Sequence, residues 1–195
     1  MNISNDFEWF KACLKNEQLI NKLKNIKLIV TDIDGCLTDA NVYPNEGSEE
    51  TKGFSVQDGF AVVKAIQSGL KISLLTGKTG QILEKRASDI NIEKSLCYFG
   101  FGENKTKALE QILEQTHLTK NEILFFGDDV LDIELKNKVS LFACPSNAIF
   151  YIKPEADLIL PKSGGHGAFR LLLDLVLFVQ KKHFKQNLIE NAIKK

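Results

Sequence analysis

The sequence of 195 residues has no excess of either charge, no long apolar run and no closely paired cysteines. Lys and Arg number 25 and Asp and Glu number 25, so the basic surface typical of nucleic-acid-binding proteins is missing. The apolar run LLLDLVLFV, which begins at Leu171, is too short to cross a bilayer and contains Asp174. We therefore expect no nucleic-acid partner and no membrane segment.

The start of the chain also lacks the apolar core and small-residue cleavage site of a secretory signal, because MNISNDFEWFKACLKNEQ mixes acids and bases throughout. The four cysteines are scattered and form no CxxC pair, which favours reduced, packed thiols over disulfides or a zinc site. They are Cys13, Cys36, Cys97 and Cys144. We expect a cytoplasmic protein.

What the chain does contain is an alternation of apolar runs with helical patterns. The runs IKLIV, LKISLL and EILFF each lead into a polar cluster, TDIDG, TGK and GDD respectively. Helical patterns occupy residues 59–68, 81–90 and 105–115, and the short strands VSLFAC and ADLILP precede a closing helix from about Ala168. This order predicts an α/β fold with a central parallel sheet, helices on both faces and a site at the carboxyl ends of the strands.

The same pattern predicts the organisation of the chain around this core. Residues 1–25 form an amphipathic helix, residues 26–180 the core, and residues 181–195 a polar helix or tail. Residues of about 38–57 break the alternation and carry a Pro-Asn-Glu-Gly turn, which predicts a β-hairpin flap over the sheet edge. We expect no large cap domain.

Acidic side chains gather at the predicted sheet edge. Asp32 and Asp34 follow the first strand, and Asp128 and Asp129 follow the third apolar run. Two carboxylates about 4 Å apart repel by roughly 4 kcal/mol at an effective dielectric of about 20, so protons or a cation must compensate. Oxygen ligands without nearby His or Cys select a hard ion such as Mg2+.

Phosphate-binding groups fall at the same edge. Thr76 ends the second run, and Lys105 opens a helix, with Lys107 as a more exposed rival. A carboxylate, a metal, a hydroxyl and a lysine suit phosphoryl transfer to an aspartate. A phospho-accepting receiver opens with its acidic pair and has the phospho-accepting Asp on a later strand. Here the DxD motif comes first, and the pair Asp128-Asp129 comes last. Asp34 could supply the acid and base of a phosphatase.

These residues resemble the haloacid dehalogenase superfamily over about residues 26–178, in the motifs DIDGCLT, LLTG, Lys105 and GDDVLD. The resemblance implies a Rossmann-like fold in three layers, with Asp32 as nucleophile and Asp34 as acid and base. It implies Mg2+ held by Asp32, the backbone carbonyl of Asp34 and Asp128, with support from Asp129 and Asp132. It further implies that Thr76, Gly77 and Lys105 bind the phosphoryl oxygens.

A closer resemblance is to the capless branch of that superfamily that includes 3-deoxy-D-manno-octulosonate 8-phosphate (KDO 8-phosphate) phosphatases. It rests on YPNEGSEETKGFSVQDG from Tyr43, Arg86-Ala87, and GGHGAFR from Gly164. The branch implies hydrolysis of this sugar-acid phosphate in lipopolysaccharide biosynthesis, with Lys78, Arg86 and His166 contacting substrate. It also implies a homotetramer in which the hairpin of one subunit helps to close its neighbour's site.

Two positions depart from this branch and leave alternatives open. Lys78 stands where Arg is usual, and Leu171 stands where Glu often follows the closing Arg. Phosphatases for nonulosonate 9-phosphates, of the sialic acid or KDN type, share the scaffold but often have an acid at the Lys78 position. A non-catalytic oligomerisation domain, like those fused to cytidylyltransferases, is the alternative from another class, although no catalytic residue is missing here.

Overall fold

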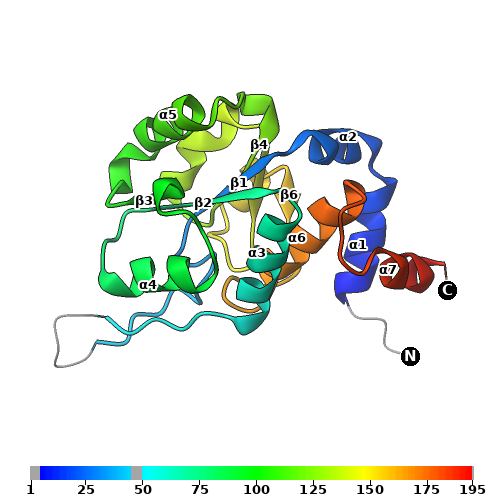
Figure 1. The fold of residues 1–195 in the computed structure, drawn as a ribbon, viewed down its shortest axis with the longest axis horizontal. Helices are drawn as coiled ribbons and strands as arrows, with labels where there is room; N and C mark the ends of the chain where they lie inside the picture. The colour runs from blue at the N-terminus through cyan, green and yellow to red at the C-terminus, as the bar shows by residue number, and fades with distance from the viewer. Residues whose placement is uncertain (1–4, 45–49, 195) are drawn as a thin grey trace.

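The computed structural model describes residues 5–44 and 50–194, and a six-stranded parallel sheet forms its centre (Figure 1). The strand order is β3-β2-β1-β4-β5-β6. The strands are β1 (Leu28–Thr31), β2 (Lys71–Thr76), β3 (Cys97–Phe99), β4 (Ile123–Phe126), β5 (Leu141–Cys144) and β6 (Leu158–Ile159). The predicted central parallel sheet is confirmed, and β1 lies between β2 and β4, in the middle of the sheet.

The strands are buried because helices cover both faces of the sheet. Every residue of β1, β4 and β5 is buried, as expected for parallel strands covered on both sides. Ile29 of β1 is in register with Ile72 of β2 and Leu124 of β4. Since these strands run in one direction, their carboxyl ends and the polar residues after them meet at one edge.

The core helices agree with the predicted helical segments. They are α3 (Val56–Gln67), α4 (Gln81–Asp89), α5 (Lys105–Thr116) and α6 (Ala168–Val179). Side chains of α3, α4 and α6 belong to one buried apolar cluster, and those of α5 belong to the cluster on the other face of the sheet. The three-layer arrangement of the prediction is therefore present.

The N-terminal region differs from the prediction, because the single expected helix is two helices. These are α1 (Asn5–Lys15) and α2 (Glu17–Asn25), separated at Asn16. Asn16 adopts an extended backbone, and its Oδ1 accepts a hydrogen bond from the backbone N of Leu19 at 3.0 Å. An asparagine at this position caps the second helix and ends the first, since it competes for backbone hydrogen bonds.

Two shorter elements complete the chain. The edge strand β3 was not predicted, because three residues without an alternating pattern give no strand signal. The helix α7 (Gln186–Ile193) lies in the predicted polar helix or tail. Among the helices of the described residues, none is long and apolar enough to span a membrane.

The predicted hairpin flap is present in part. Tyr43 and Thr51 form one antiparallel bridge, and Figure 1 shows the chain on either side of it running out from the sheet edge. Residues 45–49, the predicted turn among them, lie outside the described residues. Ser55 caps α3, which begins at Val56, so the inserted segment ends slightly earlier than predicted.

Candidate active site

Asp32 stands at the carboxyl end of the central strand β1 and is only 8% exposed. Its Oδ1 accepts a hydrogen bond from the backbone N of Ile33 at 2.6 Å, and its Oδ2 accepts one from Nζ of Lys105, also at 2.6 Å. Its own backbone N donates to the carbonyl of Phe126 at the end of β4. The candidate nucleophile is thus fixed on three sides.

Asp132 holds the acidic loop after β4 in place. It is completely buried, its Oδ2 accepts hydrogen bonds from the backbone N of Asp128 at 2.8 Å and of Asp129 at 3.1 Å, and its Oδ1 accepts from Lys105 at 2.6 Å. Both oxygens are therefore already engaged. Lys105 bridges Asp132 to Asp32.

The buried charges perturb one another strongly. Burial, together with the charge of Asp132, raises the pKa of Asp32 to about 6, although Lys105 opposes the rise. Burial and the charges of Asp132 and Asp32 raise the pKa of Asp128 to about 8. Burial lowers the pKa of Lys105, but Asp132 and Asp32 outweigh it, so the pKa is raised. Protons bound to Asp32 and Asp128 thus neutralise negative charge, and a cation could do the same.

The carboxylates fit a magnesium ion. One oxygen each of Asp32, Asp128 and Asp132 lie within 4.8 Å of one another, and all the donors are hard oxygen ligands. Gly35, which has a φ of +81°, brings the loop after β1 against this group, since a Cβ there would lie 1.9 Å from Oδ2 of Asp128. Only glycine allows that close approach.

Asp34 is turned to a different partner. Its Oδ1 accepts a hydrogen bond from Nζ of Lys52, which reaches in from the inserted segment and has a side chain only 2% exposed. No function was predicted for Lys52 from the sequence. The sequence does contain a clue to Lys52, because this residue lies in the TKGF part of the segment that resembles the capless branch.

The loop after β2 supplies the candidate phosphate-binding residues. Thr76 is buried, and its Oγ1 accepts a hydrogen bond from the backbone N of Lys78 at 3.3 Å. A Cβ on Gly77 would lie 2.8 Å from the Cα of Gly102, so this loop packs closely against the chain that leads into Lys105. The half-exposed Lys78 points to the inserted segment, with its Nζ 3.7 Å from Oε1 of Glu50.

The other candidate substrate residues contact the protein itself. Arg86 stacks on Phe54, with its guanidinium 5.3 Å from the ring centroid, and its Nη2 donates to the carbonyl of Ser55 at 3.0 Å. His166 is exposed, and its Nδ1 lies 3.1 Å from the carbonyl of Gly164. Their roles toward a substrate stay predictions.

Asp58 lies where the three segments that resemble the capless branch meet, those that begin at Tyr43, Arg86 and Gly164. Its carboxylate accepts hydrogen bonds from the backbone N of Gly167 at 3.3 Å and of Arg170 at 2.6 Å, so it caps the start of α6. The next residue, Gly59, leaves room for Arg86, because a Cβ there would lie 2.3 Å from Nη2. The three segments thus form one interlocked support beside the site.

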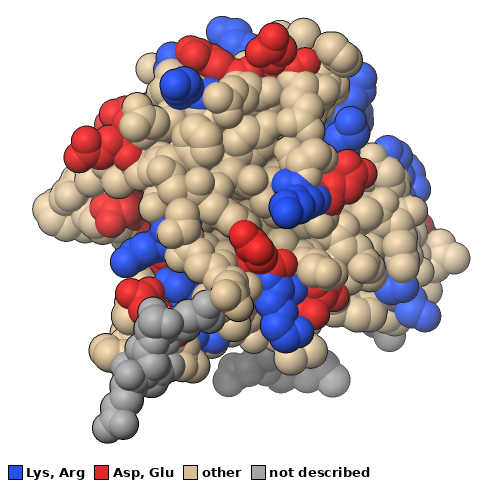
Figure 2. Space-filling view, turned by 60° about the vertical axis from the view of Figure 1, so that its left-hand side comes forward, with Lys and Arg blue, Asp and Glu red and all other residues tan. Residues whose placement is uncertain are grey.

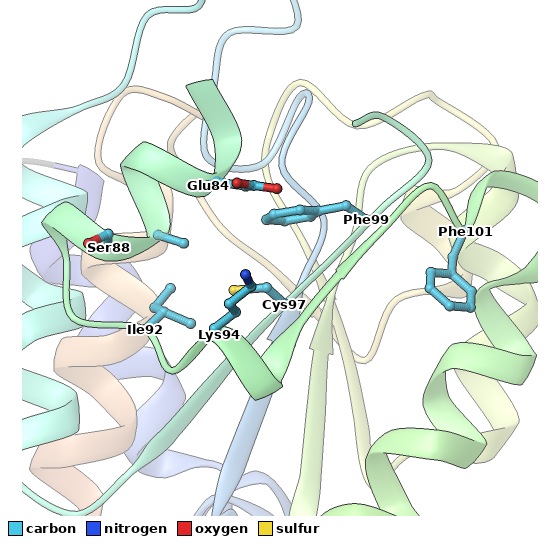
Figure 3. Close-up of a pocket in the computed structure, with 8 residues that line it drawn as sticks. Glu84, Ser88, Ile92, Lys94, Cys97, Phe99 and Phe101 are labelled. Atoms are coloured by element: carbon cyan, nitrogen blue, oxygen red, sulfur yellow. The ribbon is translucent and has the colours of Figure 1, made fainter. Parts of the chain in front are cut away.

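A hollow lies away from the carboxylates. It has a volume of about 550 Å³ and lies between α4 and the edge strand β3 (Figure 3). Figure 3 shows side chains of both elements around it, among them Glu84, Ser88, Cys97 and Phe99. Because the titratable residues with the strongest mutual effects are at the ends of β1 and β4, we place the chemistry there.

This arrangement of strand-end residues on a parallel sheet defines the class of aspartate-dependent phosphatases with a haloacid dehalogenase fold. The comparisons agree, since residues 99–172 match the family model described as haloacid dehalogenase-like hydrolase. The chain is 32% identical over 164 residues to 3-deoxy-D-manno-octulosonate 8-phosphate phosphatase KdsC of Escherichia coli strain K12, covering 84% of this chain and 86% of that protein.

Solved structures give the same grouping. The 3-deoxy-D-manno-octulosonate 8-phosphate phosphatase from Yersinia pestis superposes with a TM-score of 0.81 at 30% identity, covering 85% of this chain and 88% of that one. The enzyme from Moraxella catarrhalis, solved with magnesium, phosphate and KDO, gives a TM-score of 0.79 at 28% identity, with coverages of 89% and 96%. The chain belongs to the haloacid dehalogenase-like hydrolases, in the capless phosphatase branch with these enzymes.

Proposed function

We propose that this phosphatase hydrolyses 3-deoxy-D-manno-octulosonate 8-phosphate to the free sugar acid and phosphate, and that Mg2+ is its cofactor. The observation that carries the proposal is the pairing of Asp32 with Lys105 beside Asp128, in a chain that is similar over most of its length to enzymes named for this substrate. The magnesium ion in the Moraxella enzyme supports the choice of metal.

In this reaction the side chains have separate tasks. A carboxylate oxygen of Asp32 attacks phosphorus, and Asp34 protonates the sugar oxygen that leaves. Asp34 then takes a proton from water as that water hydrolyses the aspartyl phosphate. Lys105, Thr76 and Gly77 bind the phosphoryl oxygens. Mg2+, held by Asp32, the carbonyl of Asp34 and Asp128 with Asp129 and Asp132 in support, neutralises charge on the transferred group.

Recognition of the sugar acid is assigned to cationic and imidazole groups at the same edge. Lys78, Arg86 and His166 are the proposed substrate contacts, and the exposure of Lys78 and His166 supports access to a ligand. We further propose a homotetramer in which the inserted segment helps to close a neighbouring site. The four free cysteines support a cytoplasmic location.

The test is phosphate release from a panel of sugar phosphates, with Mg2+ and with excess chelator. We expect the highest kcat/KM on the octulosonate 8-phosphate and loss of activity with chelator. A higher kcat/KM on a nonulosonate 9-phosphate would reassign the substrate within the same chemistry. If no ester releases phosphate, the remaining alternative is a non-catalytic oligomerisation domain. A long-lived phosphorylated form would favour a phospho-accepting receiver. Light scattering of the same sample measures the number of subunits.

A further inference from the structure

Lys52 is a buried cation in a segment that joins β1 to α3. Its side chain is 2% exposed, although an ammonium group is costly to bury without an anion beside it. Its Nζ donates to Oδ1 of Asp34 and lies 3.7 Å from Oε2 of Glu50. The shielding of this charge indicates a defined position, unlike that of a solvated surface lysine.

The backbone is held on both sides of Lys52. Before it, Thr51 donates from its backbone N to the carbonyl of Tyr43 at 3.1 Å in the antiparallel bridge. After it, Arg86 stacks on Phe54 and donates to the carbonyl of Ser55. The protein therefore anchors the segment at two points and brings the Lys52 ammonium to Asp34.

The two aspartates of the DxD motif consequently have separate lysines. Asp32 is bonded to Lys105, and Asp34 is bonded to Lys52. We propose that Lys52 is a positioning residue for Asp34: its ammonium fixes Oδ1 and leaves Oδ2 to exchange the catalytic proton. This inference rests on the proposed phosphatase reaction and deepens it, because it explains how one carboxylate is kept for proton transfer while the other attacks.

The proton count shows what Lys52 would affect. When Asp32 attacks, the bond between phosphorus and the sugar oxygen breaks, and the Asp34 proton passes to that oxygen. When water attacks, its proton passes to Asp34, and the bond between phosphorus and Asp32 breaks. Lys52 keeps its protons in both steps. Its removal should therefore impair proton transfer by Asp34 and leave the attack by Asp32 intact.

The experiment compares Lys52→Met and Lys52→Arg with a control, Lys24→Met, in which an exposed lysine of α2 is changed in the same way. Two substrates are used: the octulosonate 8-phosphate, whose leaving oxygen needs a proton, and p-nitrophenyl phosphate, whose leaving group does not. Steady-state kcat and KM are measured on both, with the initial burst of p-nitrophenolate on the second.

We expect Lys52→Met to lower kcat on the sugar phosphate about 100-fold or more, with KM changed less than about threefold. The p-nitrophenolate burst should keep the wild-type rate, because the first step on that ester needs no acid. Lys52→Arg should recover kcat to within about tenfold of wild type, and Lys24→Met should have the wild-type kcat.

Three results would overturn the role of Lys52: unchanged kcat in Lys52→Met, a change confined to KM, or equal loss of the burst and of sugar-phosphate turnover. If Lys52→Met does not fold, Asp34→Asn and the double variant decide, because without the Asp34 carboxylate the loss of Lys52 should cost no further kcat. A wild type that hydrolyses neither ester would contradict the proposed function itself.

Discussion

At the scale of single residues, the buried cluster at the ends of β1 and β4 is arranged by hydrogen bonds between charges. Lys105 joins Asp32 to Asp132, and Asp132 in turn accepts the backbone N–H groups of Asp128 and Asp129. Lys105 therefore keeps an anionic partner, Asp132, if the charge of Asp32 is removed.

This geometry separates catalytic loss from structural loss in one variant. In Asp32→Asn we expect phosphate release to fall about 1,000-fold or more, because an amide cannot form the phospho-enzyme. The melting temperature should not fall, since Lys105 stays paired with Asp132 and one buried carboxylate charge is removed. Activity close to wild type would contradict the assignment of Asp32 as nucleophile.

The raised pKa values of Asp32 and Asp128 predict a pH-dependent effect of magnesium. In the metal-free protein, the free energy of unfolding should fall as the pH rises from about 4 to about 8. The reason is that folding raises the pKa of these carboxyls, so their deprotonation destabilises the folded state. Mg2+ needs ionised carboxylates, and it stabilises the native state that binds it. The rise in melting temperature on adding Mg2+ should therefore be larger at about pH 8.5 than at about pH 6.

Thermal melts in Mg2+ and in chelator across this pH range measure the effect. Ca2+ serves as a comparison, because it accepts longer and more numerous oxygen ligands. A magnesium effect that is equal at both pH values would show that Asp128 is not protonated in the metal-free protein.

At the scale of elements, the start of α6 depends on a side chain from a different helix. Asp58 of α3 accepts hydrogen bonds from the backbone N of Gly167 and Arg170, at a helix end whose own preceding residue, Gly167, has no side chain to cap it. The next residue, Gly59, packs against Arg86 of α4, so α3 contacts both α6 and α4.

We expect Asp58→Ala to lower the free energy of unfolding by about 1–3 kcal/mol, because it leaves buried helix N–H groups without an acceptor. Asp58→Asn should cost less, since one acceptor oxygen remains. Urea unfolding monitored by circular dichroism measures both. Asp89→Ala, which removes an exposed pair with Lys85, is the control and should change stability by no more than about 0.5 kcal/mol.

At the scale of the whole molecule, α1 and α2 pack against α6. Phe10 packs edge-to-face on Phe178 of α6 at 5.5 Å between ring centroids, and Trp9 donates from Nε1 to the carbonyl of Ile159 at 2.8 Å. Phe10 and Phe178 belong to one buried apolar cluster, and Trp9 packs against it. Charged side chains of both signs alternate over the face in Figure 2, without an extended patch of one sign.

Phe10→Ala should therefore destabilise the protein by about 3–4 kcal/mol, through lost burial and the cavity it leaves. We expect kcat/KM to stay within about twofold of wild type at temperatures where the variant is folded, because no candidate site residue contacts Phe10. Chemical unfolding and steady-state kinetics on one preparation check both. A loss of activity without a loss of stability would show that α1 acts on the site.

The strand-end clusters show how much of the site could be predicted. Asp32, Thr76 and Asp128 each follow an apolar run, and parallel strands bring such positions to one edge whatever the details of packing. The capping of α6 by Asp58 could not be predicted, since residues 109 apart in the chain carry no local pattern that links them. The short strand β3 was missed because three residues give no period.

The alternation of strands and helices and the order of the motifs follow from the sequence alone, because apolar periodicity and strand-end chemistry are local properties. Tertiary structure alone decided which lysine meets which aspartate, Lys105 for Asp32 and Lys52 for Asp34. It also decided that Arg86 stacks on Phe54 and that Asn16 divides the first helix. These choices depend on how distant segments pack, since a charged or capping side chain takes whichever partner the folded chain brings within reach.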